Sequence, residues 1–188
     1  MKKIKTGWNL PILPLPICIV GAHVNGKPNF NTVAWFNMLS AKPPLIGVTM
    51  LKTHYTNDGI KENKSFSINI PSCNMVIATD YCGLYSGDKV DKSQIFDVFY
   101  GELKTAPMIK EAVFNIECKL VNTIDFKDDD FFIGEINEVY SEKKEYLKNP
   151  LDIKKLNLFM FLMPNGPYLK VGEYLEKAYD VGKNYKPK

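Results

Sequence analysis

Cysteine and histidine are scarce in this sequence of 188 residues, which contains four cysteines and two histidines. No two cysteines form a C-x-x-C pair, the spacing that is typical of zinc, iron–sulfur and thioredoxin-like sites. A metal centre is therefore not expected. Cys18 and Cys118 lie inside apolar runs, where a free thiol behaves as a small hydrophobic side chain. We expect both of these cysteines to be free and buried.

Long hydrophobic runs and a dominant charge are lacking as well. Pro11, Pro14 and Pro16 interrupt the apolar stretch near the N-terminus, which therefore does not have the pattern of a signal peptide. No window approaches the ~20 apolar residues of a membrane-spanning helix. The 24 basic and 21 acidic residues leave a net charge of +3, and the lysines are scattered rather than clustered as in a nucleic-acid-binding patch. We expect a cytoplasmic protein whose partners include neither nucleic acid nor a membrane.

Many segments of the chain have the alternating or continuous apolar pattern of β-strands. The expected strands are 17–24, 31–39, 45–51, 66–70, 112–124, 131–140, 157–163 and 168–171. Asn25-Gly26 predicts a tight hairpin after the first of them, because both residue types tolerate a positive φ. Asp128 to Asp130 predicts a polar turn between the two longest strands.

Helical patterns are few and short. One helix is expected to begin at Thr56 as its N-cap and to end near Lys64, and another to run from Ser72 to about Leu84. Many strands, few helices and Gly/Pro turns favour one all-β domain over residues 1–188, a closed or partly closed barrel with peripheral helices. The motifs G-x-G-x-x-G and G-x-x-x-x-G-K-[ST] are absent, which excludes the common dinucleotide and P-loop folds.

A short polar segment after the strand at 45–51 has the composition of an anion site. Lys52 and His54 offer positive charge, while Thr53 and Thr56 offer hydroxyl groups at the start of a helix, whose N–H groups favour an anion. Spacing alone favours a solvated polar loop in which Thr56 merely caps the helix. His54 carries a charge only below a pKa near ~6.5 unless a phosphate raises that pKa.

Several motifs follow one another in an order that is more specific than any one of them. They are Gly26-Lys27-Pro28-Asn29, Thr32, Ala34-Trp35, Pro43-Pro44-Leu45-Ile46, Lys52-Thr53-His54-Tyr55-Thr56, Phe66-Ser67-Ile68-Asn69-Ile70-Pro71-Ser72 and Ser86-Gly87-Asp88-Lys89-Val90-Asp91-Lys92. In this order the sequence resembles the flavin reductase-like family, in its flavoredoxin branch. The family often has arginine where His54 stands. The resemblance implies an FMN-binding split β-barrel that forms a homodimer, with the flavin near the interface and the segment 164–174 reaching the partner.

The resemblance also implies which residues hold the flavin. Thr53, Thr56 and His54 would contact the phosphate. The short polar side chains of Asn29, Thr32 and Asn37 suit the ribityl hydroxyl groups or the ring edges. The segment from Ala34 to Asn37 would lie along the flavin, with Trp35 either against the ring or in the barrel core. Lys92 would face the polar edge of the ring, although an exposed loop lysine is commonly just solvated. The complete set of expected cofactor-binding residues is Asn29, Thr32, Ala34, Trp35, Phe36, Asn37, Leu51, Lys52, Thr53, His54, Thr56 and Lys92.

The activity that the resemblance implies is that of an FMN-dependent oxidoreductase. NADH, NADPH or a redox protein would reduce the flavin, and no side chain is expected to be catalytic, because the cofactor carries the chemistry. A flavin-containing electron carrier without nicotinamide activity is the alternative. A barrel without flavin and a pyridoxamine-phosphate oxidase-like barrel are further alternatives, and the order of the motifs favours the flavoredoxin-like proteins.

Overall fold

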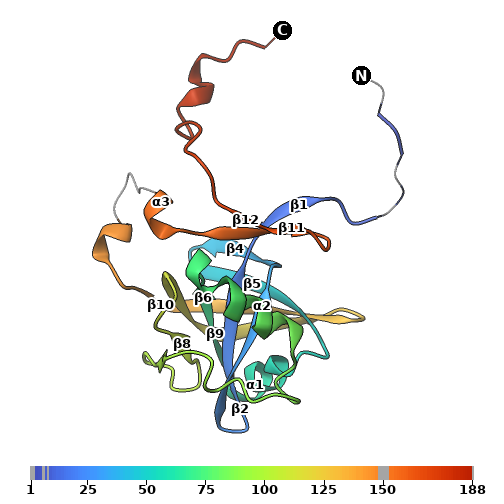
Figure 1. Ribbon diagram of the computed structural model, residues 1–188, viewed down its shortest axis with the longest axis vertical. Helices are drawn as coiled ribbons and strands as arrows, with labels where there is room; N and C mark the ends of the chain where they lie inside the picture. Colours follow the sequence, from blue (N-terminus) through green and yellow to red (C-terminus); the bar gives the residue numbers. More distant parts are fainter. Residues whose placement is uncertain (1–2, 6, 8, 148–152, 188) are drawn as a thin grey trace.

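The computed structural model describes residues 3–5, 7, 9–147 and 153–187 of the chain, and its largest element is an antiparallel sheet of seven strands (Figure 1). The strands are β2 (Cys18–Val24), β3 (Lys27–Val33), β4 (Phe36–Ala41), β5 (Pro44–Leu51), β6 (Ser65–Ile70), β9 (Phe114–Asp125) and β10 (Asp129–Ser141). They follow the order β3-β2-β6-β9-β10-β5-β4 in the sheet. The predicted mostly-β architecture is confirmed.

The hairpin between β2 and β3 forms at the predicted Asn25-Gly26 pair, where both residues have a positive φ, of 51° and 75°. The strand expected at 31–39 is wrong, because this stretch contains two strands. β3 pairs with β2 at one edge of the sheet, whereas β4 pairs with β5 at the other. Between them the Trp35 carbonyl accepts a hydrogen bond from the Thr49 N–H of β5 at 2.9 Å. The link at Ala34 and Trp35 thus carries the chain between the two edges of the sheet.

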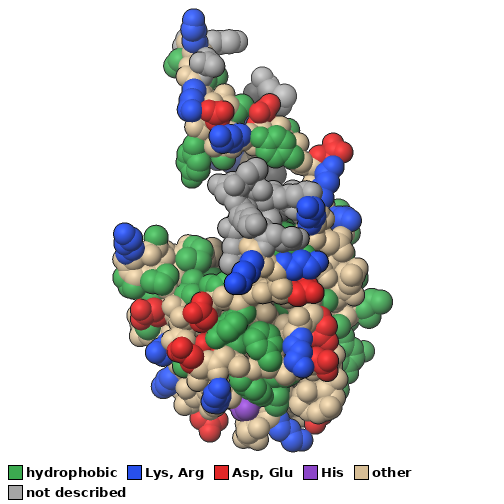
Figure 2. Space-filling view, turned by 90° about the vertical axis from the view of Figure 1, so that its left-hand side faces the viewer, with side chains coloured by type: hydrophobic (Ala, Val, Ile, Leu, Met, Phe, Trp, Pro, Cys, Tyr) green, Lys and Arg blue, Asp and Glu red, His purple; other side chains and the backbone are tan. Residues whose placement is uncertain are grey.

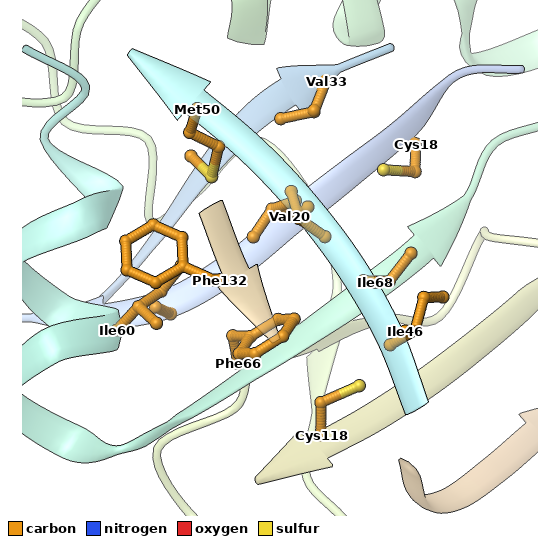
Figure 3. Close-up of a cluster of buried hydrophobic side chains, with 12 residues drawn as sticks. Cys18, Val20, Val33, Ile46, Met50, Ile60, Phe66, Ile68, Cys118 and Phe132 are labelled. Atoms are coloured by element: carbon orange, nitrogen blue, oxygen red, sulfur yellow. The ribbon is translucent and has the colours of Figure 1, made fainter. Parts of the chain in front are cut away.

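The curled sheet encloses a core of buried hydrophobic side chains. Figure 3 shows side chains of β2, β5, β6, β9 and helix α1 gathered around Phe66 and Phe132, which are fully buried. Burying such a side chain contributes about 1.5–3 kcal/mol relative to leaving it exposed. Cys18 and Cys118 lie in the same cluster as free, buried thiols, as the sequence predicted.

The helix α1 (Thr56–Asn63) follows β5 and packs on β2. A Cβ atom on Gly59 would lie 2.1 Å from the carbonyl oxygen of His23, so this close approach requires glycine. The N-cap residue is Tyr55, and no side chain caps the helix. The prediction that Thr56 is the cap is wrong, because Thr56 is already the first helical residue.

The helix α2 (Val76–Leu84) follows a single 3-10 turn, η1 (Cys73–Met75). Ser72 precedes that turn and makes no capping hydrogen bond. Thr32 of β3 donates its hydroxyl to the Thr79 carbonyl, which ties α2 to the sheet. Within the described residues, no helix is both long enough and apolar enough to cross a membrane.

The acidic turn is shorter than the sequence suggested. Asp129 and Asp130 already belong to β10, where they pair with Leu51 and Met50 of β5. Asp130 is buried and lies 2.6 Å from the ammonium group of Lys61 on α1. The prediction of a turn over 128–130 is therefore wrong for its last two residues, which belong to the strand, and the buried Asp130 carboxylate is paired with Lys61 of α1.

The segment after α2 crosses the outer face of the sheet, with the short strands β7 (Val98–Phe99) and β8 (Met108–Ile109). Buried polar side chains of β6 and β9 hold it there. The Asn69 Oδ1 atom accepts from the Ile109 N–H at 3.0 Å, and Glu117 accepts from the Leu103 N–H at 2.8 Å. This segment is consequently fixed to the sheet although it is mostly loop.

A second sheet of three strands, in the order β1-β11-β12, lies beside the first near both chain ends (Figure 1). Its strands are β1 (Leu13–Pro16), β11 (Phe159–Met163) and β12 (Tyr168–Lys170), and the short helical segments nearby are η2 (Lys144–Leu147), α3 (Ile153–Leu156) and η3 (Val181–Asn184). The described residues 171–187 form a C-terminal arm that extends away from the barrel (Figures 1 and 2). Its apolar side chains are open to solvent, with Leu175 89% and Tyr179 100% exposed.

Candidate functional site

The segment that joins β5 to α1 contains the polar residues predicted to form an anion site. The His54 N–H bonds to the Leu51 carbonyl at 2.9 Å, which turns the chain sharply at the end of the strand. The N–H groups of Asn57 and Asp58 bond to the carbonyls of His54 and Tyr55, at 2.9 and 3.3 Å. Those two helical N–H groups therefore already have acceptors within the turn.

Thr56 is held by a neighbouring strand. Its side chain is buried, and its Oγ1 atom accepts a hydrogen bond from the Asn29 amide at 2.7 Å. A hydroxyl group has one proton to donate in addition to the lone pairs that accept. Since the Asn29 amide uses a lone pair, the Thr56 proton remains for an acceptor in the adjacent space.

His54 is held in the same manner by Asn31, whose amide nitrogen lies 3.0 Å from the imidazole Nδ1. An amide nitrogen can only donate, so Nδ1 must be the acceptor and the proton of the neutral ring is on Nε2. Burial lowers the pKa of His54 below its ordinary value, and the charge of Lys92 lowers that pKa further, while Asp129 opposes the shift. The contact with Asn31 and the lowered pKa thus both favour a neutral ring that can donate from Nε2.

Lys92 departs most from the sequence prediction. The sequence placed it in an exposed loop, either as a flavin contact or as a solvated lysine, but the residue is 2% exposed and its ammonium group donates to the Phe30 and Cys82 carbonyls at 2.9 and 2.8 Å. Burial lowers the pKa of the Lys92 ammonium, which Cys82 and Asp88 partly offset. The two carbonyl groups use two of its three N–H bonds, so the third can reach a ligand.

These residues line a polar cavity of about 410 Å³, which we call the polar pocket. Its lining residues are Asn31, Thr53, His54, Tyr55, Thr56, Gly83, Leu84, Tyr85, Ser86, Gly87, Asp88, Lys89 and Lys92. One wall is the β5–α1 segment, and the other is the end of α2 with the loop that follows it. Hydroxyl groups, a neutral imidazole and a buried ammonium group therefore face one space.

A second cavity of about 260 Å³, the apolar pocket, is lined mainly by hydrophobic side chains. Its lining residues are Thr32, Val33, Ala34, Trp35, Thr49, Met50, Leu51, His54 and Asp129. Trp35 is 44% exposed and donates its indole N–H to the Met163 sulfur at 3.2 Å. The alternative that Trp35 is a core residue is wrong. Among the described residues, His54 alone lines both pockets, so the two spaces meet at its ring.

Four of the predicted site residues line neither pocket, namely Asn29, Phe36, Asn37 and Lys52. Lys52 points toward the β9–β10 turn, where its ammonium group lies 2.5 Å from Asp125. Phe36 packs against the barrel core, and Asn37 is exposed on β4, where its amide donates to the Met38 carbonyl. The structure thus separates Lys52 from His54, although the two lie two positions apart in the sequence.

Several residues that line these pockets were not among those predicted from the sequence. Asn31 lies on the same face of β3 as Asn29, and the period of two in a strand could have identified it. Placing the start of the strand at 31 instead of 27 hid that relation. The loop residues Ser86 to Lys89 were noted as a motif but not as site residues, and no local pattern pointed to Asp129.

The donor set of the polar pocket fits a phosphate group. The sequence contains no arginine, because all 24 basic residues are lysines, so charge for an anion must come from lysine or histidine. Lys92 supplies it inside the polar pocket, and Lys89 lines the same space. The apolar pocket next to it has the lining expected for a flat aromatic ring. Within the described residues, no cluster of three potential metal ligands occurs.

A curled antiparallel sheet, with a polar pocket and an apolar pocket meeting at its side, defines the class of this protein as a split β-barrel. The sequence matches the family model described as flavin reductase like domain over residues 10–154. The chain therefore belongs to the flavin reductase-like family, and the predicted family and fold are both confirmed.

Solved structures agree with this assignment. Flavoredoxin from Methanosarcina acetivorans is 49% identical to this chain, with a TM-score of 0.92 over 97% of this chain and 98% of that one. Flavoredoxin of Desulfovibrio vulgaris (Miyazaki F) is 35% identical, with a TM-score of 0.87 over 97% and 100% of the two chains. An FMN-binding protein from Thermus thermophilus, solved with bound 1-cyclohex-2-enone, is 25% identical, with a TM-score of 0.79 over 94% and 99%.

Proposed function

We propose that this chain binds one FMN and transfers electrons through it. The observation that carries the proposal is the meeting of the two pockets at His54, with phosphate-type donors on one side and an apolar surface on the other. FMN has the matching division into a dianionic phosphate, a polar ribityl chain and a flat ring. The names of the similar structures, two flavoredoxins and an FMN-binding protein, support the same cofactor.

The polar pocket would hold the phosphate. Thr53, Thr56 and His54 would donate hydrogen bonds to it, and hydrogen bonds to charged groups are the stronger ones. Lys92 would neutralise part of the charge from a buried position. Because its position is fixed by two carbonyl groups, little further ordering of that side chain is needed on binding.

The apolar pocket would hold the ring. Ala34, Trp35 and Leu51 would pack against it and exclude water, and Asn29 would act through Thr56. The Thr32 hydroxyl proton is taken by the Thr79 carbonyl, so Thr32 would accept rather than donate. Lys92 lines the polar pocket and not the apolar one, so we no longer assign it to the edge of the ring.

The cofactor supplies the redox chemistry when it is bound, and the protein residues orient it and exclude water. We propose an oxidoreductase reduced by NADH or NADPH. A carrier reduced only by a protein partner is the second candidate, which the similarity to two flavoredoxins favours. Localisation in the cytoplasm stays a prediction.

A visible spectrum followed by anaerobic reduction tests these proposals together. The purified or reconstituted protein should have a flavin spectrum with about one FMN per chain. A colourless protein whose melting temperature FMN does not change would refute the cofactor. Rapid bleaching by NADH or NADPH without oxygen supports the reductase, whereas bleaching by dithionite alone supports the carrier.

We also propose a homodimer, in which the C-terminal arm packs on the partner subunit. The segment expected to reach the partner, 164–174, is partly tied to its own chain, since Tyr168 donates to Asp80 of α2 at 2.7 Å. The arm beyond it has Leu175, Tyr179 and Tyr185 from 78% to 100% exposed, a degree of exposure that favours a contact with another molecule (Figure 2). Light scattering should give about twice 21.4 kDa.

A further inference from the structure

Two asparagine side chains of β3 hold the β5–α1 segment in a regular pattern. Asn29 donates to Thr56 at 2.7 Å, and Asn31 lies 3.0 Å from the Nδ1 atom of His54. The two asparagines lie two positions apart in the strand, and so do their two partners, in the opposite chain direction. The contacts thus repeat like the rungs of an antiparallel ladder, which we call the amide ladder.

The amide ladder fixes the direction of every hydrogen bond in it. Each asparagine presents its NH₂ group, which has no lone pair and can only donate. Thr56 Oγ1 and His54 Nδ1 must therefore both accept. The polar hydrogens left on these two side chains, the Thr56 hydroxyl proton and the His54 Nε2 proton, are donors, and both residues line the polar pocket.

We propose that Asn31 is a positioning residue that holds His54 as its neutral Nε2–H tautomer, so that His54 gives a ligand in the polar pocket a hydrogen bond and not a charge. The proposal rests on the proposed function for the identity of that ligand, the FMN phosphate. Asn31 itself need not touch the phosphate for this role. Its side chain is buried, with 6% of the residue exposed, so it has little freedom to release His54.

The charged groups around His54 agree with a neutral ring. Lys92 and Lys89 line the polar pocket on the side of the α2 loop, together with Asp88. Asp129 lines the apolar pocket from β10. A second cation at His54, next to the buried ammonium group of Lys92, would be unfavourable before any anion has bound. Lys92 then supplies the positive charge in the polar pocket, and His54 supplies an uncharged hydrogen-bond donor.

This arrangement makes phosphate recognition insensitive to pH where histidines usually titrate. Between pH 6.5 and 8.5 the affinity of the wild-type protein for FMN should change by less than about threefold, since the second ionisation of a phosphate monoester lies near pH ~6. Asn31→Asp places an obligate acceptor opposite Nδ1, so His54 must carry a proton there and becomes an imidazolium at low pH. In that variant, FMN affinity should fall at least about tenfold from pH 6.5 to 8.5, as the ring loses its charge.

Nuclear magnetic resonance of the ligand-free protein tests the tautomer without any cofactor. The chain has only two histidines, so ¹⁵N-histidine labelling gives two ring systems, and His23→Gln assigns them. We expect Nε2 of His54 to carry the proton at pH 7 in the wild-type protein and Nδ1 to carry one in Asn31→Asp. A His54 ring in the wild-type protein that is protonated on Nδ1 at pH 7, whether neutral or charged, would overturn the proposal.

Asn31→Ala is the control for the charge that Asn31→Asp introduces. It frees both tautomers of His54, so FMN should bind more weakly by about three- to tenfold while riboflavin, which lacks the phosphate, binds as before. Unchanged FMN affinity in Asn31→Ala, or equal pH profiles for Asn31→Asp and wild type, would refute the positioning role. Failure of FMN to bind any of the proteins would refute the proposed function instead, and the tautomer measurement would still stand.

Discussion

Replacing Thr56 by valine removes one hydroxyl group and keeps the shape of the side chain. Thr56 is 1% exposed and accepts from the Asn29 amide at 2.7 Å, which leaves its own proton for the phosphate. A hydrogen bond to a charged group contributes about 1.5–3 kcal/mol. Since ~1.4 kcal/mol is a factor of ten in affinity, FMN should bind about ten- to a hundredfold more weakly.

The same substitution should lower the free energy of unfolding of the ligand-free protein. It removes the acceptor of the buried Asn29 amide, and a buried donor without an acceptor costs about 1–3 kcal/mol. The further ~1 kcal/mol that follows the loss of a helix cap is not expected, because Tyr55 and not Thr56 occupies the N-cap. Urea unfolding measures this effect separately from binding.

Fluorescence titration with FMN and with riboflavin separates the two roles of Thr56. Riboflavin has the same ring and no phosphate, so its affinity should hardly change in Thr56→Val. Thr56→Ser is the matched control, since it retains the hydroxyl and should keep most of the affinity for FMN. If riboflavin and FMN weaken equally, Thr56 shapes the pocket as a whole, and the assignment of the phosphate site is refuted.

Three further predictions follow from the described contacts. Lys92→Met should lower the affinity for FMN by more than about tenfold. In the wild-type protein the affinity should fall as the pH rises through the lowered pKa of Lys92, because only the protonated ammonium group neutralises the phosphate. Titrations up to pH 10 should find no such fall in Lys92→Met. Gly59→Ala should destabilise the protein by about 1–3 kcal/mol in urea unfolding and lower its affinity for FMN, because the added Cβ would lie 2.1 Å from the His23 carbonyl oxygen and push α1 away from β2. A variant as stable as the wild-type protein would contradict that packing. Removal of residues 171–188 should convert the dimer to a monomer in light scattering while the barrel stays folded by circular dichroism, and a persistent dimer would mean that the interface lies elsewhere.

The sequence by itself determined most of the long strands, the first hairpin and the order of the polar segments. Alternation is a local property of a strand that buries one face, so β9 and β10 could be predicted to within a few residues. Asn25-Gly26 encodes its turn because both residues tolerate a positive φ. The segment from Thr53 to Thr56 stood out as an anion site because hydroxyl and imidazole groups follow a buried strand directly.

The tertiary structure alone decided which side chains share a pocket. Nothing local separates β3 from β4, because an apolar run from Val33 to Phe36 continues across the link while the chain moves to the other edge of the sheet. Lys92 is buried because the carbonyl of Phe30, 62 positions away in the sequence, converges on it together with the carbonyl of Cys82. Lys52 points away from the polar pocket because its ion-pair partner, Asp125, lies on another strand. Hydrogen bonds and ion pairs between distant segments depend on the packing of the whole barrel, and no window of the sequence contains both partners.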